Sequence, residues 1–241
     1  DGAPLIKWDL LPFPMELSGV VLFSPSPSGK RLAIVREVAG GGDAGANGAA
    51  AGVEGGAAGF KSYNIEIWST GAAAGEPSGM VHRIATGSAH GDMMSSGWFG
   101  GFAWSKCESY AVYVARKVPP KTRSFFAANP KEGDVSVPGA QYEYREDWGE
   151  KHVGVSEVDM FVLRFAAGTV TAVPGVPANV TPGQPQLTAD GGLIYTAWSG
   201  QPRKLGILFC FQRPCKLYST NISPLLEEST EEVELVHQCL T

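Results

Sequence analysis

Three segments of the chain share one pattern of hydrophobic and polar positions. They cover residues 20–35, 101–114 and 185–196, about 82 residues apart. Each begins with a short run that contains apolar or aromatic residues, passes through a polar turn with Gly or Ser, and ends in a run rich in β-branched or aromatic residues. This pattern is typical of two antiparallel strands joined by a tight turn.

Two further short runs of the same kind follow each segment, so every unit predicts four strands. The expected third strands are residues 65–68, 159–163 and 216–218, and the expected fourth strands are residues 81–84, 169–173 and 233–236. Four antiparallel strands repeated in tandem describe the blades of a β-propeller. The chain is therefore predicted to be all-β, and a β-sandwich of short strands is the alternative fold. The three predicted blades are residues 20–87, 101–178 and 183–239.

The long connections all fall between the second and third strands of a unit. They run over residues 36–64, 115–158 and 197–215. Successive loops of an antiparallel sheet alternate between its two ends, so we expect all three to leave the same face of the propeller. Long loops commonly carry function, which makes this the expected functional face. Because three blades do not close a propeller, we expect the chain to be an incomplete propeller and a segment of a longer protein.

The composition changes this picture at two places. Residues 39–59 are nearly all Gly and Ala and have little to bury, which predicts a flexible insertion. The net charge of −5 comes from five glutamates after residue 225, so the rest of the chain has balanced charge. Nucleic-acid-binding proteins normally have a basic face, and nothing in the sequence predicts one.

Motifs for metal, cofactor or catalysis are absent from the sequence. The four cysteines form no CxxC pair and the four histidines are scattered, so we expect no metal site. Free buried thiols are expected, with a Cys210–Cys215 disulfide across a hairpin as the alternative. The sequence contains no phosphate- or dinucleotide-binding glycine motif, so we expect no cofactor. The nucleophile elbow Gly-x-Ser-x-Gly is missing too, since the most similar segment, residues 87–91, has Ala at its centre. We therefore expect no catalytic residue in this chain.

Three segments resemble motifs of a known family. Residues 141–150 contain Glu-Asp-Trp-Gly-Glu and resemble the "YEDWGE" segment of the acylaminoacyl-peptidases, or acylamino-acid-releasing enzymes, of the prolyl oligopeptidase family. Residues 175–184 are similar to their "GVPENVSPGQ", and residues 203–210 to their "RLGIRFC". The similarity is dense from about residue 100 to residue 222, thin before that and weak after residue 225.

The resemblance implies that this chain is part of a larger, two-domain enzyme. Family members join an N-terminal, WD40-like β-propeller to a C-terminal α/β-hydrolase domain that holds a Ser, Asp and His triad. They remove an N-acylated amino acid from a short blocked peptide. This chain would then be a propeller fragment, inactive alone, that covers the active site and filters substrates by size. Its expected partners are that hydrolase domain, N-acylated short peptides and further copies of itself. With no membrane-spanning run and no signal peptide in the sequence, the expected location is the cytoplasm.

Four residues of the second insertion are the candidates for a functional role. Glu146, Asp147, Trp148 and Glu150 either line a substrate gate or brace the loop and a domain interface. Two other functions remain open from the residues. One is a non-catalytic propeller scaffold that binds proteins through its functional face, and the other is the propeller of a dipeptidyl-peptidase-like enzyme.

Overall fold

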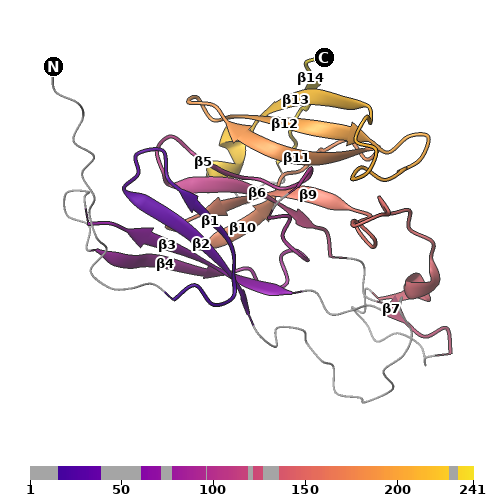
Figure 1. The fold of residues 1–241 in the computed structure, drawn as a ribbon, viewed down its shortest axis with the longest axis horizontal. Coiled ribbons are helices and arrows are strands. Elements are labelled where there is room, and N and C mark those ends of the chain that lie inside the picture. The colour runs from indigo at the N-terminus through magenta and orange to yellow at the C-terminus, as the bar shows by residue number, and fades with distance from the viewer. Residues whose placement is uncertain are drawn as a thin grey trace.

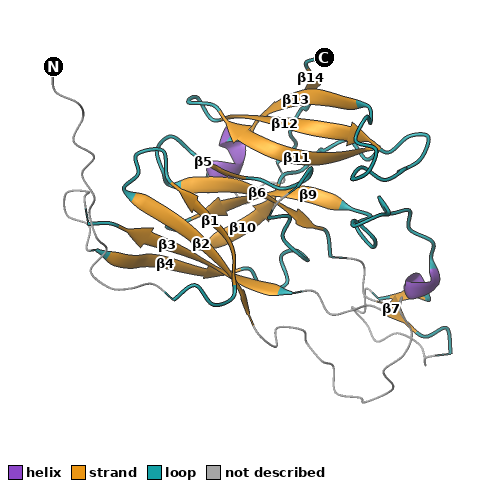
Figure 2. Ribbon diagram, viewed as in Figure 1, coloured by secondary structure: helices purple, strands orange, loops and turns teal. Residues whose placement is uncertain are grey.

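The fold is an incomplete β-propeller of three four-stranded antiparallel blades (Figures 1 and 2). A computed structural model of the chain underlies this description. The structure describes the following residues: 16–38, 61–71, 78–95, 97–118, 122–126, 136–227 and 233–241. The predicted flexible Gly/Ala insertion at residues 39–59 lies outside them.

Each blade is one sheet whose strands follow one another in space as they do in the chain. The first sheet contains β1 (Val20–Pro25), β2 (Arg31–Val38), β3 (Ser62–Ser69) and β4 (Gly79–Ala85). The second contains β5 (Phe102–Trp104), β6 (Tyr110–Arg116), β9 (Val158–Arg164) and β10 (Thr169–Ala172). The third contains β11 (Val180–Leu187), β12 (Gly192–Ser199), β13 (Cys215–Asn221) and β14 (Gln238–Cys239).

A short pair of strands and two 3-10 turns lie outside the three blades. The parallel pair of β7 (Thr122–Arg123) and β8 (Val137–Pro138) and the 3-10 turn η1 (Ala140–Tyr142) lie between β6 and β9. A second 3-10 turn, η2 (Ser223–Leu226), follows β13. In the part of the chain that the structure describes, no helix has the length and hydropathy needed to cross a bilayer.

The second sheet lies between the other two and is buried on both faces (Figure 1). In β6, Val112 and Val114 belong to the hydrophobic core shared with the third sheet, whereas Tyr113 and Ala115 belong to the core shared with the first. The alternation follows from strand geometry, because successive side chains point to opposite faces. The same division applies to β9, so both strands need apolar residues at nearly every position.

Two glycines let the second and third blades approach closely. A Cβ atom on Gly183 of β11 would lie 2.8 Å from the Cα atom of Phe99, and one on Gly101 would lie 2.6 Å from Cδ of Pro185. Any larger residue at these positions would push β11 away from the segment that leads into β5. Pro182 and Pro185 are compatible with β11 because it is the edge strand of its sheet, where a missing N–H costs least.

The predicted fourth strand of the third blade is wrong in position. Residues 233–236 are not a strand, and β14 pairs with β13 a few residues later, opposite Tyr218. Leu235 is buried in the core between the second and third sheets instead. His237 joins the two blades, since it lies 2.7 Å from the Tyr195 hydroxyl and donates from Nε2 to the carbonyl oxygen of Pro174 at 2.8 Å. Because Leu235 and His237 make these contacts with the second blade, pairing with β13 begins only at Gln238.

The cysteines are free, as expected, but the expectation that they are buried is wrong. All four are exposed in the structure: Cys107, Cys210, Cys215 and Cys239. Cys215 begins β13, Cys239 ends β14, and Cys210 lies in the connection between β12 and β13. Among the described residues, no group of His, Cys, Asp and Glu side chains is arranged to hold a metal ion.

A buried histidine links the first two blades. His90 is 1% exposed, donates from Nδ1 to the carbonyl oxygen of Gly91 at 2.7 Å and accepts from the Tyr113 hydroxyl at 2.7 Å. Its ring also packs against Phe161 of the second blade, 4.9 Å between centroids, and against Tyr63 of the first, 6.4 Å between centroids. Burial lowers the pKa of His90, although the hydrogen bond to Gly91 acts in the opposite direction. The neutral imidazole is therefore the form that fits this site.

His90 should make the stability of the chain depend on pH. Below pH 6.5 the unfolded chain binds a proton that the folded chain does not, so the free energy of unfolding should fall as the pH decreases. Above that pH the group should have no effect. Urea unfolding between pH 8 and pH 5 measures this. His90→Gln should remove most of the slope, whereas His82→Gln should keep it, and an equal slope in both variants would contradict the assignment.

Candidate functional site

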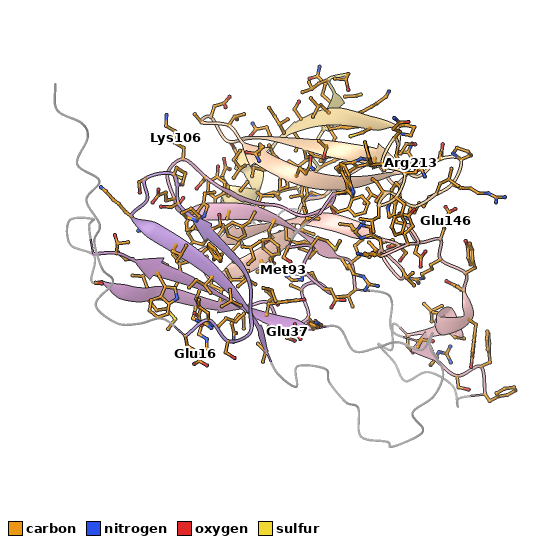
Figure 3. The ribbon with its side chains drawn as sticks, viewed as in Figure 1. Glu16, Glu37, Met93, Lys106, Glu146 and Arg213 are labelled. Atoms are coloured by element: carbon orange, nitrogen blue, oxygen red, sulfur yellow. The ribbon has the colours of Figure 1, made fainter. Side chains whose placement is uncertain are left out.

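Two of the long connections meet at one end of the second and third blades. These are residues 117–157, between β6 and β9, and residues 200–214, between β12 and β13. Figure 3 shows Glu146 of the first connection and Arg213 of the second on the same side of the molecule. All four candidate residues lie in the first connection.

Trp148 is the anchor of this connection. Its side chain is fully buried, and its indole N–H donates to Oγ1 of Thr181 in β11 at 3.0 Å. The ring packs against Phe99 at 5.2 Å between centroids, and Phe99 in turn packs against Trp198. Trp148 thus fixes the loop of the second blade to the core shared with the third.

Asp147 closes a tight turn next to this anchor. Its Oδ1 atom accepts from the backbone N–H of Gly149 at 2.9 Å, and its Oδ2 atom accepts from that of Gly154 at 2.6 Å. Gly149 and Glu150 both have positive φ, 65° and 53°, so the chain reverses here. A short acidic side chain that accepts from nearby N–H groups is a common way to stabilise such a turn.

Glu150 joins the two connections. Its Oε2 atom accepts hydrogen bonds from the backbone N–H groups of three successive residues, Ile207, Leu208 and Phe209. Desolvation raises the pKa of Glu150, but these three donors outweigh it and hold the pKa below its usual range. Gly206 has a φ of 78°, and a Cβ atom there would lie 2.6 Å from the Glu150 carboxyl carbon, so glycine is favoured at this position. We call this arrangement the Glu150 clamp.

Two cations stabilise this region: Lys204 joins the two connections, and Arg213 acts within the second. Lys204 donates from Nζ to the carbonyl oxygen of Glu146 at 3.3 Å and to that of Ser156. Burial lowers the pKa of Lys204 although nearby carboxylates act to raise it. Arg213 donates to the carbonyl oxygens of Gly206 at 2.7 Å and Leu205 at 2.9 Å, which fixes the conformation of residues 205–213.

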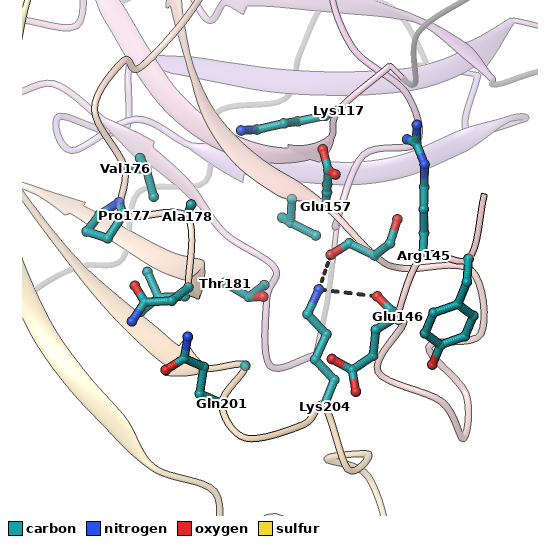
Figure 4. Close-up of a pocket in the computed structure, with 16 residues that line it drawn as sticks. Lys117, Arg145, Glu146, Glu157, Val176, Pro177, Ala178, Thr181, Gln201 and Lys204 are labelled. Carbon is teal, nitrogen blue, oxygen red and sulfur yellow. Dashed lines mark hydrogen bonds between the residues drawn. The ribbon is translucent and has the colours of Figure 1, made fainter. Parts of the chain in front are cut away.

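A cavity of about 530 Å³ lies beside these contacts, between the second and third blades (Figure 4). The cations of Lys117, Arg145 and Lys204 and the carboxylates of Glu146 and Glu157 line it. The lining has no cysteine or histidine, so its three hydroxyl residues, Tyr144, Ser156 and Thr181, have no histidine beside them in the lining. Its chemistry is suited to contacts with a polar ligand rather than to nucleophilic catalysis.

The four candidate residues therefore differ in what they contact. The side chains of Asp147, Trp148 and Glu150 make internal contacts, whereas the side chain of Glu146 lines the cavity. Sequence reasoning missed Lys204 and Gly206, which lie inside the segment that resembles "RLGIRFC". The hydrogen bonds of Lys204 run to carbonyl oxygens about 50 residues away in the sequence, so no local pattern indicates them.

Comparison with known proteins places this architecture in a family. The family described as "Acylamino-acid-releasing enzyme, N-terminal domain" matches residues 2–239. The chain belongs to this family. The resemblance found in the sequence is therefore confirmed, and the match also covers the N-terminal hundred residues, where similarity of motifs is thin.

Several relatives of the family are similar over most of this chain. The mouse acylamino-acid-releasing enzyme is 31% identical over 223 residues, which are 87% of this chain and 28% of the mouse protein. Acylamino-acid-releasing enzyme 1 of rice is 31% identical over 232 residues, 90% of this chain and 26% of the rice protein. The human enzyme is 29% identical over 222 residues. The chain thus spans little more than a quarter of the length of the curated relatives it matches.

Replacing Trp148 should loosen the contact between the two blades. Trp148→Phe keeps an aromatic ring but leaves a gap and removes the donor to Thr181. We expect the free energy of unfolding to fall by about 2 kcal/mol or more. Trp98→Phe is the matched control, since Trp98 is only partly buried. Chemical denaturation of both variants measures the difference, and equal losses would show that Trp148 has no special structural role.

Replacing Glu150 should release the backbone that it holds. Glu150→Gln removes the charge, so the amides of residues 207–209 should exchange with deuterium faster than in the parent chain. In the parent, the protection of these amides relative to their intrinsic exchange rate should also fall as the pH drops below 4.5, the ordinary value, because the clamp is lost when Glu150 is protonated at its lower folded-state pKa. Glu146→Gln, which leaves the clamp intact, should not change these amides. Faster exchange at residues 207–209 in both variants would contradict the clamp.

Proposed function

We propose that this chain is the N-terminal propeller part of a serine peptidase that releases N-acylated amino acids from blocked peptides. The observation that carries the proposal is the family match over residues 2–239, together with relatives named acylamino-acid-releasing enzymes. The sequence has no nucleophile elbow, so catalysis would reside in the remaining part of the enzyme. The propeller would cover the active site and limit access to short peptides.

Two of the candidate carboxylates, Asp147 and Glu150, are not available to bind a free substrate amine. A dipeptidyl-peptidase-like propeller would need carboxylates available to bind a substrate ammonium group. Here Asp147 and Glu150 accept hydrogen bonds from backbone N–H groups, so both are already engaged. An acylated peptide has no N-terminal charge and needs no such partner. This leaves Glu146 and Glu157, whose side chains line the cavity among three cations, as the candidates for direct contact with the peptide.

The remaining parts of the proposal concern the whole protein. We propose a cytoplasmic enzyme whose copies associate, and whose hydrolase domain is the principal partner of the propeller. The alternative of a non-catalytic scaffold draws support from the exposed aromatic residues on the same loops. It differs from the enzyme in a simple respect, since a scaffold hydrolyses no peptide.

The full-length protein should prefer acetylated substrates. We expect kcat/KM for acetyl-alanine p-nitroanilide to exceed that for alanine p-nitroanilide by about a hundredfold, because the cavity carries three cations against two carboxylates and disfavours a further ammonium group. The 241-residue chain alone should hydrolyse neither compound. Preference for the free amine would favour the dipeptidyl-peptidase reading, and no hydrolysis by the full-length protein would favour the scaffold.

A further inference from the structure

Exposed hydrophobic side chains are concentrated on the two connections that form the site. Among the described residues, sixteen large hydrophobic side chains are exposed, and ten of them lie on residues 117–157 and 200–214. Single exposed apolar residues are ordinary, but a concentration on one face usually indicates an interaction surface. The clearest group lies on the connection that Glu150 holds.

That group is a set of three exposed side chains around one buried residue. Leu205, Phe209 and Phe211 are 59%, 77% and 58% exposed, whereas Ile207 is fully buried in the core. Phe211 stacks on Trp98, with ring centroids 5.8 Å apart and planes at 18°. We call Leu205, Phe209 and Phe211, with the ring of Trp98, the aromatic platform.

The backbone beneath the platform is held in place by polar contacts. The Glu150 clamp fixes the N–H groups of residues 207–209, and Arg213 fixes the carbonyl oxygens of Leu205 and Gly206. A loop free to rearrange would turn its aromatic side chains toward the core and remove apolar area from water. Here the polar contacts keep these side chains facing outward. Such preorganisation reduces the entropy lost when a partner binds.

The surroundings of the platform match the anatomy of a protein interface. The apolar centre has charged neighbours in Glu150 and Arg213, which hydrogen-bond to the backbone of residues 205–209. Interfaces commonly combine a dry apolar centre with a polar rim. The binding of a flexible polar ligand would not by itself require three large apolar side chains outside the cavity.

We propose that the aromatic platform is the docking surface for the part of the same polypeptide that follows this N-terminal domain. This inference rests on the proposed function, because it assigns the hydrolase part of the enzyme as the occupant. The relatives are more than three times as long as the segment matched, so a large further domain has to be accommodated. A covalently linked partner is present at high effective concentration, so a surface of this modest size suffices to hold it.

The test uses the full-length protein and two pairs of substitutions. Phe209→Ser with Phe211→Ser removes the centre of the platform, and Met80→Ser with Val236→Ser removes two exposed apolar side chains from other parts of the propeller. We expect the platform variant to unfold in two separate thermal steps and to be cleaved between its domains about ten times faster than the wild type. The control variant should match the wild type.

A second measurement needs no variant. In the native full-length protein, hydroxyl radicals should oxidise Phe209 about ten times more slowly than in the urea-unfolded protein, because the docked domain covers it. Wild-type proteolysis in the platform variant, together with unprotected Phe209 in the wild type, would overturn the proposal.

Other occupants give different results. Loss of self-association with unchanged cleavage between domains would assign the platform to a second copy of the chain. A raised KM for acetylated peptides with unchanged proteolysis and unfolding would assign it to substrate. Both outcomes overturn the proposal as stated. Failure of the proposed function is seen separately, as the absence of hydrolysis of acetylated peptide by the wild-type protein.

Discussion

Burial of the second sheet on both of its faces is the constraint on which the rest of the structure depends. Strands β6 and β9 contribute alternate side chains to two different cores, one shared with the first blade and one with the third. Neither face of this sheet is available for polar chemistry. The variable parts of the chain are therefore confined to the sheet ends, where the long connections leave.

The site at one such end shows how a loop can be made rigid without a core of its own. Trp148 reaches into the core that the two blades share, while Asp147 and Glu150 satisfy backbone N–H groups that would otherwise face water. The carboxylates of Asp147 and Glu150 are therefore already hydrogen-bonded to the backbone before any ligand binds. The loops that they hold present a fixed surface of apolar side chains.

The sequence was sufficient to predict the strands but not the contacts of the loops. Strand prediction succeeded because alternation of side chains is a local property, visible within a few residues. It failed for residues 233–236, where Leu235 and His237 contact another blade and the pairing with β13 begins later. The partners of Glu150 are backbone groups 57 to 59 residues further along, which no local pattern indicates. The exposure of Cys215 likewise depends on the short β14, which pairs with β13 only at Tyr218 and Ser219 and leaves the start of β13 uncovered.

Hydrogen exchange across the three sheets tests the central claim most directly. If the second sheet joins both cores, the amides of Val112 and Phe161 should exchange only through global unfolding. Rising denaturant should then release β3 and β12 in the same transition. Persistent protection of β3 or β12 after β6 and β9 have lost theirs would contradict the account, since the outer blades would then be stable without the sheet between them.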